Sequence, residues 1–378
     1  MKQVCKHIYA KSLVLLCAWG LVFSAVAQTP NFSSSNLDYN GFPNGNLPTS
    51  ISFGPDDRLY VLDLYGTVYV YTVQRNGVDD YQVTAAEELS SAVKGIPNHN
   101  DDGTPNSSVD NRLATGIAVA GTAANPVIYV ASSDSRIGGP SGDKDLDTNS
   151  GVITRITWSG SSWDAVDIVR GLPRSEENHA TNGIEVVNIN GVDYLIVSQG
   201  GHTNAGSPST NFAWHTEYAL SAAVLAIDLA QLNAMQIQND GVRDYIYDLP
   251  TLDDPTRANF NGIDDPNDPT YNGIDTSDPW GGNDGLNQAK LVDGGPVQIF
   301  SPGYRNTYDL VVTASGAVYV TDNGANGGWG GYPFNEGLSG TVNNDYRPGE
   351  PGSTSFDSEF DEPKVNNVDS LTDRKSVV

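Results

Sequence analysis

Short apolar runs bounded by turn residues recur along the chain, and this pattern constrains the fold more than any other feature of the sequence. The clearest unit is Ile51–Asp63, where two runs rich in β-branched and aromatic residues flank an Asp-rich turn. Gly66 then leads to a third run over Thr67–Val73. Runs of this length, separated by tight turns, predict antiparallel strands rather than helices.

The same plan returns at least three more times along the chain. It recurs over 116–132 together with 151–158, over 183–198, and over 310–321. The segment 219–237 is the one helical candidate, and we predict a strand over 223–227 followed by a short helix. Loosely repeated units of three or four strands favour a radial β-propeller over a sandwich.

The N-terminus has the pattern of an export signal. Three lysines precede an apolar run, Leu13–Val26, that ends in the small-residue site Ala25-Val26-Ala27. We therefore expect residues 1–27 to be a signal peptide cleaved after Ala27, and the protein to be secreted or periplasmic. No later segment approaches the roughly 20 apolar residues of a spanning helix, so no membrane span is expected.

Composition excludes several function classes. Both cysteines, Cys5 and Cys17, lie within the predicted signal, so a mature chain would hold no disulfide and no Cys-based metal site. The formal net charge of −26 makes nucleic acid an unfavourable partner. Many carboxylates stand in Asp/Asn/Gly-rich loops, which favours divalent cation binding or a salty exterior, and a solvated surface explains most of them.

Composition also divides the chain after the signal. We expect a propeller over 28–340, with an insertion at 252–287 that is crowded with Asp, Asn, Gly and Pro. From 341 to 378 the sequence is polar and lacks a comparable strand pattern, which predicts a tail, a linker or a truncated blade. The propeller is therefore expected to be incomplete at its C-terminal end, with further domains possible downstream.

Two clusters carry groups suited to chemistry. His179 lies just before the run at 183–198, where a propeller's connecting loops reach the central channel, and a neutral imidazole there could accept a proton from a hydroxyl. A histidine that only caps its loop is the alternative. Arg305 and Asn306 offer donors for an oxyanion or carboxylate, and Asp322–Asn326 has the composition of a calcium loop. A surface arginine beside an Asx-rich turn is the alternative for the second cluster.

These residues resemble the soluble glucose/sorbosone dehydrogenase family, six-bladed β-propellers that bind pyrroloquinoline quinone (PQQ) with calcium and oxidise aldoses at C1. The resemblance rests on Gly171-Leu172-Pro173 followed by His179, and on Arg305-Asn306 followed by Asn323-Gly324-Ala325. It covers roughly residues 47–337, with the insertion outside it. The family's later lysine and arginine contacts to the quinone carboxylates have no counterpart in this sequence, which marks the chain as an incomplete or divergent member.

The resemblance implies a role for each matched residue. His179 would be the general base and Arg305 would stabilise charge on the cofactor. Asp63, Arg305, Asn306 and Asn323 would contact PQQ. The carbonyls of Gly324 and Ala325, with Asp322, would bind Ca²⁺. The implied function is a secreted sugar dehydrogenase whose substrate is a small aldose.

Two other functions remain open from the residues alone. A non-catalytic propeller that binds carbohydrate or protein would use the loop aromatics Trp280, Trp329, Tyr332 and Phe334. A hydrolase or lyase would use Glu176 and Glu177 beside His179, although adjacent residues of one strand would face opposite sides.

Overall fold

The computed structural model describes the strand-rich regions of the chain. The described residues are 34, 37, 47–89, 93, 95–100, 103–138, 144–206, 210–212, 215, 217–250, 289–324 and 326, together with the backbone of 369–373. The predicted signal at 1–27, the insertion at 252–287, Ala325 and the four loop aromatics lie outside them, as does most of 341–378.

The chain divides into two compact units. One comprises residues 1–37 with 75–82, and the other comprises residues 38–74 with 83–378. In the first unit the Arg75 guanidinium lies 5.6 Å from the centroid of the Tyr81 ring. The second unit holds the cores, the candidate site and all the strand residues described below apart from Arg75, Tyr81 and Gln82.

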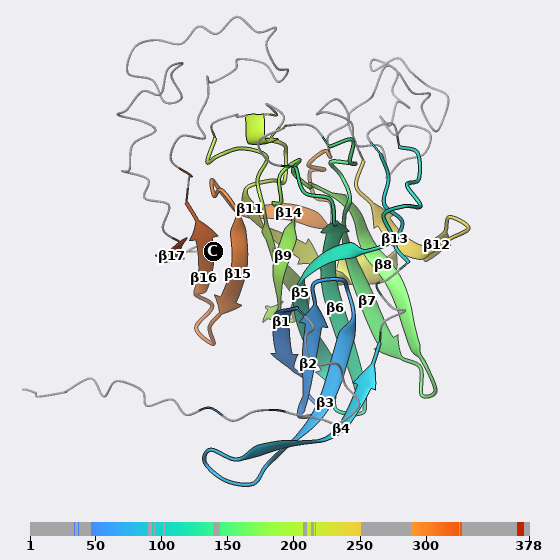
Figure 1. Cartoon of the computed structure of the whole chain (residues 1–378), viewed down its shortest axis with the longest axis vertical. Helices are drawn as coiled ribbons and strands as arrows, with labels where there is room; N and C mark the ends of the chain where they lie inside the picture. The colour runs from blue at the N-terminus through green and yellow to red at the C-terminus, as the bar shows by residue number, and fades with distance from the viewer. Residues whose placement is uncertain are drawn as a thin grey trace, which may run out of the picture. The chain divides into compact units, whose positions relative to one another are not determined.

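The first sheet has the order β1-β2-β3-β4 (Figure 1). Its strands are β1 (Pro48–Phe53), β2 (Arg58–Asp63), β3 (Val68–Arg75) and β4 (Tyr81–Glu88). The three strands predicted from the sequence are therefore present. The β2–β3 turn is closed by Asp63, whose Oδ1 accepts from the backbone amides of Tyr65 (3.0 Å) and Thr67 (2.8 Å).

The second sheet is the largest, with the order β12-β13-β8-β7-β6-β5. Its antiparallel part comprises β5 (Arg112–Thr122), β6 (Asn125–Asp134), β7 (Gly151–Trp158) and β8 (Trp163–Leu172). The short strands β12 (Gln238–Asn239) and β13 (Asp244–Asp248) extend it, and β13 pairs with β8 in parallel. The Arg170 guanidinium secures that join through ion pairs with Asp240 (2.6 Å) and Asp248 (2.6 Å).

All strands of the third and fourth sheets follow β8 in the chain. The third has the order β14-β11-β10-β9, from β9 (Thr181–Ile189), β10 (Val192–Gln199), β11 (Ala223–Asp228) and β14 (Val297–Pro302). The fourth comprises β15 (Thr307–Val312), β16 (Val318–Asn323) and β17 (Asp369–Asp373).

The helical candidate is confirmed as a strand followed by a short helix. Strand β11 runs directly into α3 (Leu229–Ala234). The Asp228 carboxylate caps this helix by accepting from the amides of Ala230 (2.8 Å) and Gln231 (3.0 Å), because the first turn of a helix leaves its N–H groups unpaired. A single-turn 3₁₀ helix, η1 (Thr210–Phe212), precedes it.

The first strand of each sheet lies at a sheet edge, and these edge strands contact one another in the order β1, β5, β9, β15. Side chains tie each junction by bonding to a neighbouring backbone carbonyl. Thr49 donates to Ala114 (2.7 Å), Thr115 to Thr181 (2.9 Å), and Asn182 to Thr307 (2.8 Å). Between β9 and β15 the approach is close enough that a Cβ on Gly183 would lie 2.5 Å from Asp309 Oδ1.

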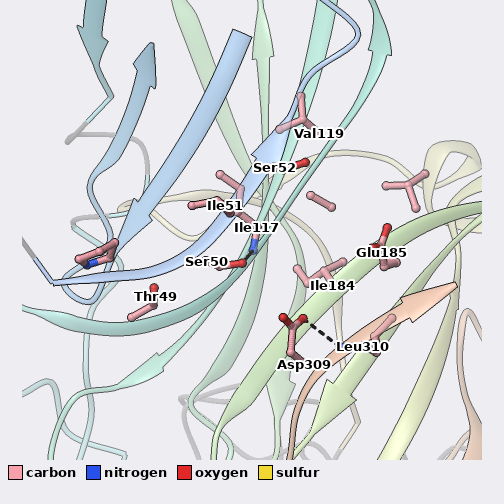
Figure 2. Close-up of a pocket in the computed structure, with 13 residues that line it drawn as sticks. Thr49, Ser50, Ile51, Ser52, Ile117, Val119, Ile184, Glu185, Asp309 and Leu310 are labelled. Carbon is pink, nitrogen blue, oxygen red and sulfur yellow. Dashed lines mark hydrogen bonds between the residues drawn. The ribbon is translucent and has the colours of Figure 1, made fainter. Parts of the chain in front are cut away.

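The four edge strands surround a cavity of about 460 Å³, shown in Figure 2. The apolar side chains Ile117 and Ile184 line it together with two carboxylates, Glu185 and Asp309. Three apolar clusters make up the core, and their members come from adjacent pairs of sheets. Separate sheets whose first strands meet around one cavity form the all-β, propeller-like fold that the sequence predicts. The count of six blades stays a prediction.

No helix among the described residues has the length and apolar character needed to cross a membrane.

Candidate functional site

His179 lies in the loop between β8 and β9, and its side chain is buried. Ser175 fixes the backbone of this loop, since its Oγ accepts from the His179 amide (3.0 Å) and its amide donates to the His179 carbonyl (3.0 Å). The ring nitrogen Nδ1 lies 2.7 Å from the carbonyl oxygen of Gly201. A carbonyl can only accept, so Nδ1 carries the proton and Nε2 keeps the lone pair that a general base needs.

Burial also sets the charge of this imidazole. It lowers the pKa of His179 well below the usual value, and the nearby positive charges of Arg305 and Arg174 lower it further. The Gly201 hydrogen bond opposes this shift. His179 is therefore neutral at pH 7, and the ring is held in the orientation of a base.

Arg305 and Asn306 lie in the turn that leads into β15, and both are buried. Their backbone amides donate to one carboxylate, that of Asp322 on β16, at 3.2 Å from Arg305 and 2.8 Å from Asn306. The Arg305 Nε donates to the side-chain oxygen of Asn204 (2.8 Å). Asn182 on β9 donates to the Asn306 side-chain oxygen (3.1 Å). Hydrogen bonds from separate strands and loops thus fix the pair in place.

The two clusters singled out in the sequence meet at Gly201. Its amide donates to the Arg305 carbonyl (2.9 Å), while its own carbonyl accepts from His179. The preceding residue, Gly200, forms an isolated antiparallel bridge with Asn306. A Cβ on Gly201 would lie 2.8 Å from the Arg305 oxygen, so only glycine permits this approach. The structure therefore brings together His179, Arg305 and Asn306, which are far apart in the chain.

Charge at the Arg305 side chain is partly balanced. Burial lowers the pKa of Arg305, and the carboxylates of Glu177 and Asp322 oppose that shift. Burial in turn raises the pKa of Glu177, against the opposing effect of Arg305. The cation of the site is therefore desolvated, which strengthens its interaction with an anionic or polarised oxygen.

The predicted calcium loop is only partly described. The Asp322 carboxylate accepts from the backbone amides of Arg305 and Asn306. The Asn323 side chain is oriented so that Nδ2 donates to the Asn306 carbonyl (2.9 Å) and its oxygen accepts from Arg305 (3.0 Å). Gly324 follows β16 directly, and Ala325 lies outside the described residues. Within the described part of the chain, no group of three or more acidic, histidine or cysteine side chains could hold a metal ion.

A hollow of about 360 Å³ opens beside these residues. Its lining consists of Asn306, Tyr308, Thr321, Asp322 and Asn323. Three of the predicted cofactor and metal residues therefore line one space. This hollow is distinct from the cavity in Figure 2, which is lined by residues of β1, β5, β9 and β15.

Three acidic residues, Asp63, Glu176 and Glu177, lie in surroundings that the sequence did not indicate. Asp63 is buried, and its carboxylate accepts hydrogen bonds within the β2–β3 turn; in the described part of the chain none joins it to His179 or Arg305. The sequence predicted that Glu176 and Glu177 share a strand and face opposite sides of it. They lie instead on a bend between β8 and β9, because β9 begins only at Thr181. The Glu176 carboxylate accepts from the Lys144 amide (2.8 Å).

Several residues of the site were not assigned a role from the sequence. Asn182, Asn204 and Glu217 carry hydrogen bonds that fix it, and Phe212 lies with its ring centroid 5.0 Å from that of His179. The one signal that pointed to them is Gly200-Gly201 at the end of a buried strand, since paired glycines there indicate a close backbone approach.

Comparisons with known proteins give only distant matches. No protein-family model and no curated protein matches the sequence. Among solved structures, the calcium structure of Carbohydrate-Active Enzymes Family AA12 from Trichoderma reesei aligns at 14% identity and a TM-score of 0.39, over 85% of this chain and 60% of that one. The iodide structure of the same family gives 15% identity and a TM-score of 0.37, over 79% and 54%.

A third solved structure comes from Thermus thermophilus and is described as a "putative oxidoreductase (glucose dehydrogenase)". It aligns at 15% identity and a TM-score of 0.28, over 73% of this chain and 91% of that one. The chain spans less than two thirds of the two Trichoderma structures. The function proposed below therefore rests on the residues of this chain.

Proposed function

We propose that this protein is a secreted aldose dehydrogenase that oxidises the C1 hydroxyl of a sugar with PQQ and Ca²⁺. The observation that carries the proposal is the junction at Gly201, where a neutral, Nδ1-protonated His179 and a buried Arg305 are held by one residue. Gly201 holds the His179 imidazole and the Arg305 backbone, and the charge of the Arg305 guanidinium acts on the imidazole. A base with a desolvated cation nearby suits removal of a hydroxyl proton beside a polarised acceptor.

His179 performs the proton step in this proposal. Its Nε2 lone pair accepts the proton of the C1 hydroxyl, and the Gly201 carbonyl bonds the Nδ1–H on the other side of the ring. That bond stabilises the imidazolium that forms and keeps the ring from turning. PQQ, when bound, supplies the two-electron acceptor for the hydride that leaves C1.

The donors of the site fit the oxygens of a quinone. Arg305 and Asn306 would hold PQQ beside the hollow at Asn323, because a buried guanidinium favours carbonyl and carboxylate oxygens. Gly324 and Ala325 would supply carbonyls for Ca²⁺, with Asp322 nearby. Asp63 is left out of the proposed contacts because its carboxylate is engaged in its own turn.

The proposal includes export. The N-terminal pattern supports cleavage after Ala27, and a protein recovered outside the cytoplasm should begin at Gln28. Intact mass of the exported protein measures this directly, and a full-length chain retained in the cytoplasm would contradict it.

The testing experiment is a titration of the purified, calcium-loaded chain with PQQ, followed by dye reduction on a panel of aldoses. We expect saturable binding, and we expect His179→Ala to lower kcat by about 10²- to 10⁴-fold while PQQ binding changes little. The exposed neighbour variant Asn178→Ala is the control and should keep wild-type turnover. Absence of binding at micromolar PQQ, or turnover that survives His179→Ala, would overturn the proposal.

A further inference from the structure

Glu217 lies behind the Gly201 junction and is tied to it by short hydrogen bonds. Its Oε1 accepts from the His202 backbone amide (2.6 Å) and from Ser221 Oγ (2.5 Å). Its Oε2 accepts from Thr203 Oγ (2.6 Å). Burial raises the pKa of Glu217, and the three hydrogen bonds oppose that rise. Three donors on one carboxylate fix the chain over 202–203 against the segment that enters β11.

The peptide between Gly201 and His202 connects this carboxylate to the imidazole. Its N–H donates to Glu217, and its C=O accepts from His179 Nδ1 (2.7 Å). A trans peptide is planar, so its N–H and C=O point in opposite directions and move together. A carboxylate on the N–H side also polarises the carbonyl and makes it a stronger acceptor.

Packing leaves this peptide little freedom to move. A Cβ on Gly201 would lie 2.9 Å from Glu217 Oε1 and 2.8 Å from the Arg305 carbonyl oxygen, so both neighbours touch the glycine. On the other side, the His202 ring stacks on Tyr218 with centroids 3.7 Å apart. A change at Glu217 is therefore expected to shift the Gly201–His202 peptide, and with it the hydrogen bond to His179, because the tight packing leaves no free space around that peptide.

We infer that Glu217 is a positioning residue that orients and polarises the His179 imidazole through the Gly201–His202 peptide. In this relay the Glu217 carboxylate accepts from the peptide N–H, and the peptide C=O accepts from the His179 Nδ1–H. The proton is thereby held on Nδ1, and the lone pair is on Nε2. The inference deepens the proposed function and rests on it only in taking His179 as the base, since the relay itself is a statement about hydrogen bonds. The other charged groups that act on the imidazole are Arg305 and Arg174.

The test is nuclear magnetic resonance of the ¹⁵N-histidine-labelled full chain, with the His179 signals assigned by His179→Gln. We expect wild type to show a protonated Nδ1 whose hydrogen-bonded proton lies far downfield. Glu217→Gln keeps the shape but removes the charge, so this proton should move upfield and the acid limb of the His179 titration should move to lower pH. Asp167→Asn, which removes a buried carboxylate held by Thr154 and Arg243, should leave the signal unchanged.

Activity provides a second readout. Glu217→Gln should lower kcat about 10-fold while KM changes less than about 2-fold, because the base is misaligned but sugar contacts remain. A resonance that stays unchanged in folded Glu217→Gln would overturn the inference even if the enzyme is active. A shifted resonance in a protein without dehydrogenase activity would keep the relay and reject the proposed function.

Milder variants cover the case in which Glu217→Gln does not fold. Ser221→Ala and Thr203→Val each remove one donor to the carboxylate and leave Glu217 itself in place. Each leaves the carboxylate charge shared by fewer donors, which strengthens its bond to the His202 amide, so the His179 proton should move slightly further downfield. No movement in either variant would overturn the inference.

Discussion

His179 and Arg305 are joined through a single glycine, since Gly201 accepts from the His179 Nδ1 at 2.7 Å and donates to the Arg305 carbonyl at 2.9 Å. The two residues come from loops before β9 and before β15, which belong to different sheets. The junction fixes the tautomer of the base and the backbone of Arg305, while Asn204 and Asn323 hold the Arg305 guanidinium.

The pH dependence of turnover should report the buried imidazole. Burial lowers the pKa of His179 well below its usual 6.5, so the neutral base is present at every pH above that lowered value. We therefore expect kcat to stay level between about pH 6.5 and 8 and to fall only at lower pH. The measurement is kcat against pH on a saturating aldose. An inflection at or above pH 6.5 would contradict the buried, neutral His179.

Replacing Gly201 should lower activity much more than it lowers the stability of the fold. In Gly201→Ala the new Cβ would meet Ala222 Cβ and the Arg305 oxygen at 2.8 Å, so the junction must open. We expect a stability loss of about 1–3 kcal/mol by urea unfolding and a large fall in kcat. Gly77→Ala is the control, because its nearest neighbour would be 3.6 Å away. Wild-type kcat in Gly201→Ala would show that the junction is not needed.

The join between β8 and β13 depends on Arg170. Its guanidinium is almost fully buried, pairs with Asp240 and Asp248, and lies 3.7 Å from the Tyr245 ring centroid. Arg170→Met leaves the Asp248 carboxylate without its cation, so we expect the free energy of unfolding to fall by about 3–5 kcal/mol. The control Arg155→Met removes a hydrogen bond to Asn233 and should cost less than about 1 kcal/mol. Equal losses in the two variants would be inconsistent with a buried ion-pair network.

The carboxylates in the cavity of Figure 2 should oppose each other at neutral pH. Burial raises the pKa of both Glu185 and Asp309, and Asp309 raises that of Glu185 further. A raised folded-state pKa means that folding is favoured with the proton bound, so the cost appears as pH rises above about 4.5.

Glu185→Gln should therefore stabilise the fold at pH 7 by about 0.5 kcal/mol, a small value because both groups are partly solvated. The gain should shrink toward pH 4, because the raised pKa of Glu185 leaves less negative charge on its carboxyl there. Thermal unfolding at the two pH values measures it, with exposed Glu88→Gln as the control. A gain that is equal at pH 7 and pH 4 would rule out charge repulsion as its cause.

The sequence by itself determined the strands and the choice of His179, Arg305 and Asn306 as the chemically notable residues. Strands are local, because alternating side chains and turn residues act over a few positions, and the predicted runs at Ile51–Asp63 and 223–227 were found as β1, β2 and β11. Only the tertiary structure decided that His179 meets Arg305 at Gly201, because the two residues lie on loops of different sheets. It also revealed Glu217, whose bonds to the His202 amide and the Thr203 hydroxyl depend on how the irregular β10–β11 connection folds, and no local periodicity encodes that shape.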